Sequence, residues 1–137
     1  MSDAIERYRV ATEAGDVDAF MPLLADDAEL VSPISGRMVF RGHDDLRTLF
    51  EAVYGSLSSL TWREGTNDGR VALLRGEARI GPVRLDDAMV FELAPDGRIV
   101  RIRPHFRPFL GLLAFAVVVG VKMAAHPGVI VRALRAR

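Results

Sequence analysis

The strongest constraint on the fold is a change of hydrophobic period at Leu57, after which apolar and polar residues alternate as far as Phe106. Because successive side chains of a strand point to opposite faces, a period of two is typical of half-buried strands. Three turn sequences interrupt the alternation: Asn67-Asp68-Gly69, Gly81-Pro82 and Pro95-Asp96-Gly97. The segment therefore predicts an antiparallel meander of four strands, at residues 60–64, 71–80, 83–93 and 99–106.

The residues before Leu57 show a helical period instead. The clearest pattern lies after His43 and consists of apolar positions three and four residues apart: Leu46, Leu49, Phe50, Val53 and Tyr54. Two shorter helices are expected before it, the first ending at Gly15, and Asp26-Asp27 is expected to separate the second from a short strand at 28–32. Helices that precede a meander predict an α+β domain, which we assign to residues 1–107.

Residues 109–121 form an uncharged, apolar segment that opens a helical extension, residues 108–137. Thirteen residues are too few to cross a membrane, which takes about 20. An isolated helix of this kind would expose apolar surface on every side, so it must be covered by the domain, by a partner chain or by a membrane surface. The segment has no polar face of the kind that interfacial helices show, and packing on the domain or its dimer mate is therefore the favoured prediction.

Composition excludes several classes of protein. The chain has no Cys and only three His, at 43, 105 and 126, which predicts no metal site. Its net charge of zero argues against nucleic-acid binding. The absence of a phosphate-binding glycine loop predicts no nucleotide cofactor. Residues 1–8 are polar, which predicts no secretory leader and a cytoplasmic protein.

Two stretches resemble a known family. AGDVDAFMPLLADDAELVSP, residues 14–33, resembles the opening of SnoaL-like and ketosteroid-isomerase-like members of the nuclear transport factor 2-like superfamily, and GRIVRIRPHF, residues 97–106, resembles their final strand. The resemblance implies a cone in which a curved antiparallel sheet wraps around the N-terminal helices and leaves an apolar pocket at its mouth. It also implies a homodimer through the outer face of the sheet, on which Arg75, Glu77, Arg79, Arg101 and Arg103 are expected.

The family's catalytic positions are only partly kept in this chain. Tyr8 matches the phenol of isomerase relatives, but Ser32 stands at the position of their base and Met89 at that of their protonated acid. A ketosteroid isomerase mechanism, which uses two such acids, is therefore not expected. Arg75-Gly76-Glu77 faintly resembles the Arg and Asp that epoxide hydrolase relatives carry two residues apart on one strand, but Pro104 replaces their final-strand acid. That activity is the less favoured one.

Asp87 is the one charge on the apolar face of its expected strand, shared with Leu85, Met89, Phe91 and Leu93. A buried carboxyl there would act as a general acid or base. At the wet end of the strand it would instead bond a turn amide or an Arg. Tyr8 is the candidate oxyanion donor, although its ring could equally be packed core with its hydroxyl on a backbone carbonyl.

The residues expected to line the pocket are Ser32, Trp62, Met89, Phe91 and Phe106. Together these residues predict a protein that binds a small, apolar, cyclic ligand. Cofactor-free isomerase, cyclase or dehydratase activity is open, and the alternative is a non-catalytic binding or interaction module.

Overall fold

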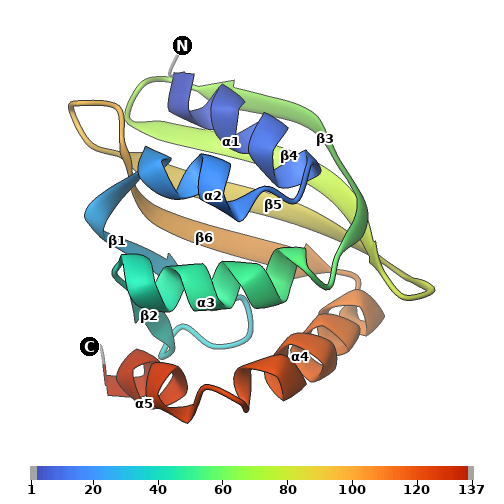
Figure 1. Cartoon of the computed structure of the whole chain (residues 1–137). Coiled ribbons are helices and arrows are strands. Elements are labelled where there is room, and N and C mark those ends of the chain that lie inside the picture. The colour runs from blue at the N-terminus through green and yellow to red at the C-terminus, as the bar shows by residue number, and fades with distance from the viewer. Residues whose placement is uncertain (1–2, 136–137) are drawn as a thin grey trace.

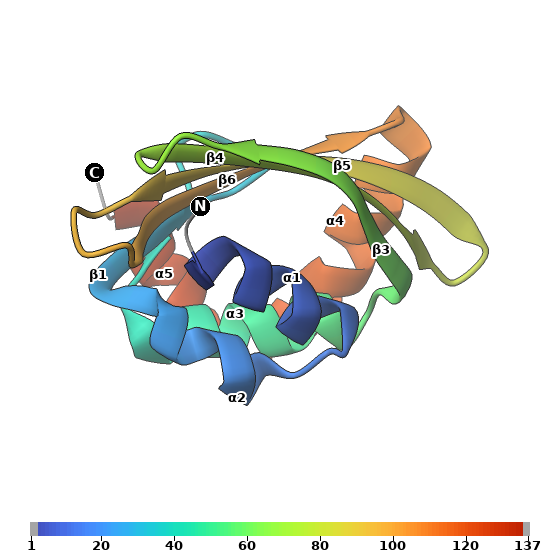
Figure 2. The ribbon, with the colours of Figure 1, turned by 90° about the horizontal axis from the view of Figure 1, so that it is seen from above.

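The computed structural model describes residues 3–135, which form one curved sheet with helices on its concave side (Figures 1 and 2). The helices are α1 (Asp3–Glu13), α2 (Val17–Phe20), the 3-10 turn η1 (Met21–Leu23), α3 (His43–Tyr54), α4 (Phe109–Met123) and α5 (Pro127–Arg135). The strands are β1 (Leu24–Val31), β2 (Val39–Arg41), β3 (Ser58–Asn67), β4 (Val71–Ile80), β5 (Val83–Leu93) and β6 (Ile99–Arg107). The expected α+β class is confirmed.

The predicted meander is present, and β3, β4, β5 and β6 pair in antiparallel order. Gly69 and Gly97 lie in its turns with φ angles of 92° and 91°, a backbone conformation that glycine adopts without strain. Along β4 and β5 alternate side chains are buried, as the period of two predicted. One side of the meander is therefore a continuous apolar face, and this face is covered by α1, α3 and α4.

The sheet differs from the expected antiparallel one in its pairing of β1. Its strand order is β2-β1-β6-β5-β4-β3, and β1 runs parallel to β6. Only β2, which returns from β1 through a short loop, pairs with β1 in antiparallel fashion. The sheet is thus mixed, because the chain reaches β6 from β1 only after passing through α3 and the whole meander.

The sequence predicts that Asp26 and Asp27 separate a helix from a strand, but in the structure both residues lie within β1. The strand is longer than predicted because it begins at Leu24, directly after the 3-10 turn that contains Pro22. Both Asp side chains are exposed, and the pairing of β1 with β6 shifts between Leu24 and Glu29. This shift is a local irregularity in the strand, and it lets the two successive Asp side chains both reach solvent.

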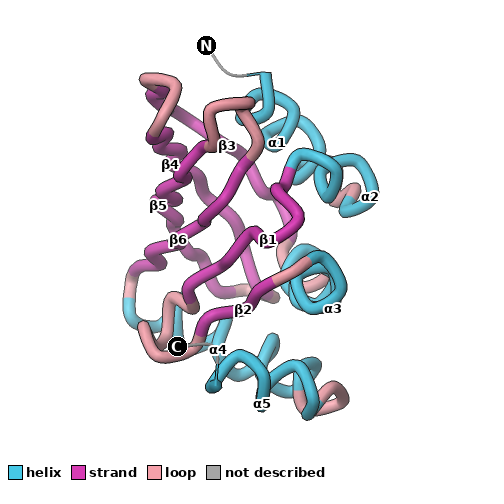
Figure 3. Tube along the Cα trace, turned by 90° about the vertical axis from the view of Figure 1, so that its left-hand side faces the viewer, coloured by secondary structure: helices cyan, strands magenta, loops and turns pink. Residues whose placement is uncertain are grey.

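The helices α1 and α3 form the core with the sheet. On α1, Ile5, Tyr8 and Thr12 are buried, and on α3 all the residues of the predicted apolar stripe are buried. Figure 2 shows the sheet arching over both helices. Figure 3 shows α1, α2 and α3 on one side of the sheet, with α4 and α5 at its lower end.

The extension forms two helices, and the last two residues of the expected final helix, Ala136 and Arg137, lie outside the described residues. α4 contacts α3 and strands β4, β5 and β6, and α5 contacts β2. The Phe115 ring of α4 lies 4.5 Å from the Phe106 ring of β6. Within residues 3–135 no single helix has the length and apolar character of a membrane span. α4 and α5 have that length and character only when they are taken together, and the pair is bent by 116°.

Candidate functional site

Two neighbouring cavities lie between the sheet and the helices. The larger has a volume of about 90 Å³ and an entirely apolar exposed lining. β1, β5, β6 and the β1–β2 loop supply one part of its wall, and α3, α4 and α5 supply the rest. Its lining includes Ser32, Tyr54, Met89, Phe106, Phe115 and Met123. The extension therefore forms part of the wall of this cavity, and a ligand in it would touch α4 and α5 as well as the sheet and α3.

The smaller cavity has a volume of about 10 Å³, which is the room that one water molecule needs. It shares Val53, Tyr54, Met89 and Phe106 with the larger cavity. Its own wall adds Trp62 and two carboxyl residues, the buried Asp87 and the partly exposed Glu77. The arrangement places an apolar chamber next to a small recess, with a wall of shared residues between them.

Two tyrosines form a buried pair beside these cavities. The Tyr8 and Tyr54 hydroxyl oxygens lie 2.6 Å apart, and Tyr8 Oη also lies 3.8 Å from Met89 Sδ. Burial raises the pKa of both phenols, that of Tyr54 well above its ordinary value, and the Asp87 carboxyl contributes to both shifts. Both tyrosines are therefore neutral hydrogen-bond donors. When Tyr8 donates to Tyr54, the Tyr54 proton is left free to point into the cavities that it lines.

Asp87 is a buried carboxyl, 7% exposed, on the concave face of β5. Its Oδ1 accepts a hydrogen bond of 3.3 Å from the backbone N–H of His105 on β6. Burial raises the pKa of Asp87 to about 8, and the His105 hydrogen bond opposes this shift. No ion pair joins Asp87 to a described basic residue. A carboxyl with such a pKa can both donate and accept a proton near neutral pH.

The expected site residues divide into those that line a cavity and those that do not. Ser32, Met89 and Phe106 line the larger cavity, and Trp62 and Asp87 line the smaller one. Tyr8 and Phe91 are fully buried and line neither; their rings pack against each other at 5.1 Å. Tyr8 therefore stands behind Tyr54, which is the phenol that faces the cavities.

Three of the cavity residues are fixed by specific contacts. Ser32 Oγ accepts a hydrogen bond from the Ile34 N–H in the β1–β2 loop. The Trp62 indole N–H donates to Thr12 Oγ1 at 2.9 Å, which ties β3 to α1. Met89 lies within reach of the Tyr8 hydroxyl. These contacts tie the β1–β2 loop, β3 and β5 to their neighbours in the cavity walls.

Tyr54 is the functional residue that the sequence reasoning missed. It was placed in the apolar stripe of α3, and its ring does pack there against Phe20 and Phe50. A signal was nevertheless present, because a buried tyrosine hydroxyl needs a hydrogen-bond partner. The chain has two tyrosines, Tyr8 and Tyr54, and both lie on the apolar faces of predicted helices.

The remaining acidic and histidine residues do not form a second site. Arg75 and Glu77, which resemble the epoxide hydrolase pair, lie on the face of β4 opposite Gly76. Arg75 pairs with Glu64 and with Glu77, and Glu77, which borders the smaller cavity, also pairs with Arg63. His105 is exposed. Within the described part of the chain, no three His, Asp or Glu side chains are grouped so that they could hold a metal ion.

The family model described as a SnoaL-like domain matches residues 5–102, which is most of the chain. The chain belongs to this family, within the nuclear transport factor 2-like superfamily. No curated protein matches the chain at a significant level.

Solved structures agree with this SnoaL-like assignment. A protein with a cystatin-like fold from Silicibacter pomeroyi is 19% identical, with a TM-score of 0.87 over 93% of this chain and 90% of that one. A steroid delta-isomerase from Pseudomonas aeruginosa is 23% identical, with a TM-score of 0.81 over 91% and 92%. An epoxide hydrolase/cyclase-like enzyme of pyran ring formation in salinomycin is 21% identical, with a TM-score of 0.61 over 80% and 91%. At these identities the likeness establishes the fold.

The first two structures also bear on the extension. An overlap of 93% or 91% of 137 residues leaves uncovered fewer residues than the thirty that follow Arg107. The overlap therefore includes at least part of α4, although the family model ends at residue 102. Some of the extension is thus shared with these relatives.

Proposed function

We propose that this SnoaL-like protein binds a small, apolar, cyclic ligand in the larger cavity and catalyses cofactor-free proton transfer on it. Isomerisation, cyclisation and dehydration are the reactions of this class. The observation that carries the proposal is that Asp87 and Tyr54 line one small recess and that Tyr54 also lines the apolar cavity beside it. The isomerase and the cyclase-like enzyme among the similar structures support it.

In this proposal Asp87 is the acid–base group. Its carboxylate takes a proton from the carbon next to a ligand carbonyl, which breaks a C–H bond and forms the carboxyl O–H. The electron pair moves to the carbonyl oxygen, and the resulting enolate accepts a hydrogen bond from the Tyr54 hydroxyl. Asp87 then returns the proton to another carbon of the ligand or to the same one. The 2.6 Å contact between the two phenols allows either oxygen to donate, and in this proposal Tyr8 is a positioning residue that donates to Tyr54, which leaves the Tyr54 proton for the ligand.

The pKa of Asp87 suits this role. A pKa of about 8 makes the carboxylate a stronger base than an ordinary Asp, while leaving a useful fraction ionised at neutral pH. A strongly raised phenol pKa keeps Tyr54 protonated, so it can donate. The two groups therefore have different protonation states at the pH where both are needed.

Solvent exchange into a cyclic ketone tests this proposal without knowledge of the natural substrate. We expect the protein to speed deuterium incorporation next to the carbonyl of cyclohexanone or cyclohex-2-enone in D2O, followed by NMR. The rate should rise with pH and level off above about pH 8, because the ionised form of Asp87 is the base. Asp87→Asn should lower the catalysed rate at least 100-fold, on the order of what general bases contribute.

Two tyrosine variants separate the donor from the residue behind it. Tyr54→Phe should lower the exchange rate about as much as loss of one oxyanion donor does, on the order of 100-fold. Tyr8→Phe should have a smaller effect, because Tyr54 keeps its own proton. Exchange no faster than in buffer, or exchange that persists in Asp87→Asn, would contradict the catalytic role.

The second candidate is ligand binding without catalysis, which Ser32 and Met89 favour because they stand where isomerase relatives carry their base and their protonated acid. Both candidates require room in the larger cavity. Its 90 Å³ is less than the cavity of about 150 Å³ that takes up benzene in an engineered protein. A ligand of that size requires α4 to shift outwards. Binding of the same ketones, seen as chemical-shift changes of Phe115 and Met123 without deuterium exchange, would support this candidate.

A further inference from the structure

The outer side of α4 is an exposed apolar stripe. Its residues are Phe109, Leu110, Leu113, Val117 and Val121, which are 45–72% exposed. The opposite side of the helix packs on the domain through Gly111, Phe115, Val119 and Met123. α4 is thus apolar on both sides, and the domain covers only one of them.

The neighbouring helix α5 continues this exposed apolar surface. Val131 and Leu134 are 43% and 54% exposed, while Val129 and Ala133 of the same helix are buried. Figures 1 and 3 show α4 and α5 along one edge of the molecule, at the bottom of both views. We call the five exposed residues of α4 and these two of α5 the α4–α5 edge.

The C-terminal part of the chain, which ends in this edge, carries charge of one sign. Residues 97–137 contain eight bases and no acid. Arg107, Lys122 and Arg135 are exposed, and none of the three forms an ion pair with another described residue. Arg132 differs, because it is paired with Asp45 of α3 at 2.9 Å. The apolar surface is therefore accompanied by unpaired positive charge.

We propose that the α4–α5 edge binds the surface of a bilayer that contains anionic phospholipid. An interfacial helix buries an apolar face among the lipids and keeps a polar side towards water. α4 has no polar residues on its inner side, but the domain covers that side and presents its own polar surface in their place. The lack of a polar face in residues 109–121 therefore does not oppose membrane binding once the helix is packed.

Charge decides between a bilayer and a second copy of the chain. Two copies that met symmetrically through this edge would bring their bases together, with no acid in residues 97–137 to compensate them. Anionic headgroups attract the same bases. The bend of 116° between α4 and α5 suits helices that lie on a membrane rather than cross it.

Co-sedimentation of the full chain with vesicles tests the proposal. We expect binding to vesicles of equal parts phosphatidylcholine and phosphatidylglycerol, much weaker binding to pure phosphatidylcholine, and a decrease at high salt. Val117→Asp should weaken partitioning at least about tenfold, because it places a charge in the exposed apolar stripe that would enter the bilayer. Arg135→Gln should weaken it about fivefold.

Val10→Asp is the matched control, since Val10 is 63% exposed on α1, away from the α4–α5 edge in Figure 1. It should bind like the unaltered chain. The proposal is overturned if the chain stays in the supernatant with phosphatidylglycerol vesicles, or if Val117→Asp binds as well as Val10→Asp. It is also overturned if light scattering without lipid shows that Val117→Asp dissociates an assembly, because the edge would then join two copies.

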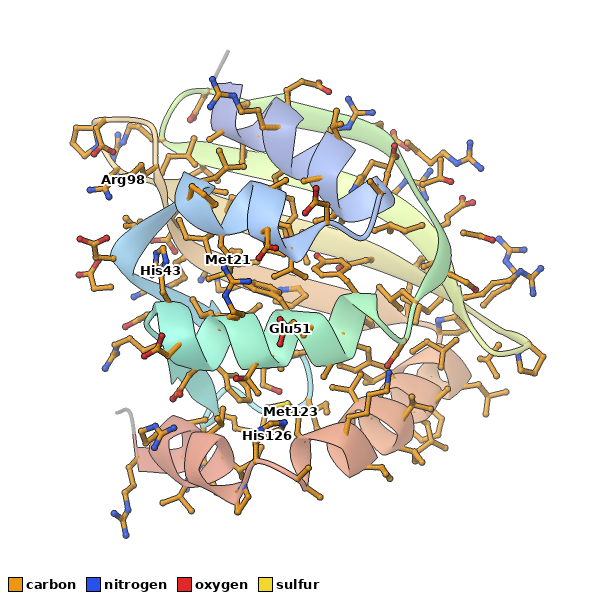
Figure 4. The ribbon with its side chains drawn as sticks, viewed as in Figure 1. Met21, His43, Glu51, Arg98, Met123 and His126 are labelled. Carbon is orange, nitrogen blue, oxygen red and sulfur yellow. The ribbon has the colours of Figure 1, made fainter. Side chains whose placement is uncertain are left out.

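Figure 4 shows Met123 and His126 close together at the junction between the two helices. Met123 is buried and His126 is exposed. The junction thus lies at the boundary between the core and solvent, and the α4–α5 edge continues on both sides of it.

Discussion

Asp87 places an ionisable carboxyl in an apolar environment, which affects the stability of the protein as well as the proposed proton transfer. In the folded protein the carboxyl keeps its proton up to about pH 8, whereas in the unfolded chain it loses the proton near pH 3.8. Between these values the unfolded state binds fewer protons than the folded state. The free energy of unfolding must therefore decrease as pH rises through this range.

We expect Asp87→Asn to remove this decrease. The difference in unfolding free energy between the variant and the unaltered chain should grow from pH 4 to pH 8, by at most on the order of 5 kcal/mol. Asn keeps an oxygen that accepts the His105 N–H, so the fold is retained. Urea unfolding at several pH values measures the effect.

Asp86→Asn is the control, because Asp86 lies on the opposite face of the same strand. It should leave the decrease in place. A difference between Asp87→Asn and the unaltered chain that does not depend on pH would mean that Asp87 is already ionised in the folded protein at low pH.

At the scale of elements, α4 depends on one glycine for its approach to the sheet. A Cβ at Gly111 would lie 2.7 Å from Leu85 Cβ and 2.8 Å from the Arg84 carbonyl oxygen. These contacts are too short for carbon, so any larger residue must push the helix away from β5. Gly120, on the same helix, would meet nothing within 4 Å.

The two glycines therefore predict opposite effects of one substitution. Gly111→Ala should lower the free energy of unfolding by about 1–3 kcal/mol, as overpacking does. Gly120→Ala should raise it by up to about 1 kcal/mol, since alanine favours a helix interior. Denaturant unfolding measures both. Equal stability of the two variants would mean that α4 does not lie against β5 as described.

At the scale of the whole molecule, the outer face of the sheet is rich in charges that pair within the chain. Arg75 is 2.7 Å from Glu64, and Glu92 pairs with both Arg101 and Arg103. Val71 and Leu73 are exposed beside them on β4. A surface with both signs of charge and some apolar area is suited to a self-complementary contact.

We therefore expect a homodimer through this outer face. Light scattering should give twice the chain mass of 15.1 kDa, and Leu73→Glu should shift the mass towards that of one chain. Val10→Glu, which alters an exposed residue on α1, should not do so. A monomer mass that does not change with concentration would contradict the expectation.

The extension is integrated with the rest of the molecule rather than added to it. Met123 and Ile130 help to close the larger cavity, and Phe115 packs against β6. The cavity is therefore bounded by residues from Leu30 to Ile130 in the chain. Any ligand that enters it must contact or displace α4.

The sequence by itself determined the elements and their buried faces. The period of two identified β4 and β5 to the residue, and it placed Asp87 among the inward side chains of β5. The helical period identified α3 and its buried residues. These features are local, because the side of an element that is buried depends on the spacing of apolar residues along the chain.

Only the tertiary structure decided which of these faces meet. It placed β1 parallel to β6, brought the Tyr54 hydroxyl to Tyr8 across 46 residues of sequence, and left one side of α4 uncovered. Periodicity states that a face is buried but not what buries it. The partner of each face follows from the packing of all the elements together, and so the phenol that faces the cavities could be identified only from the fold.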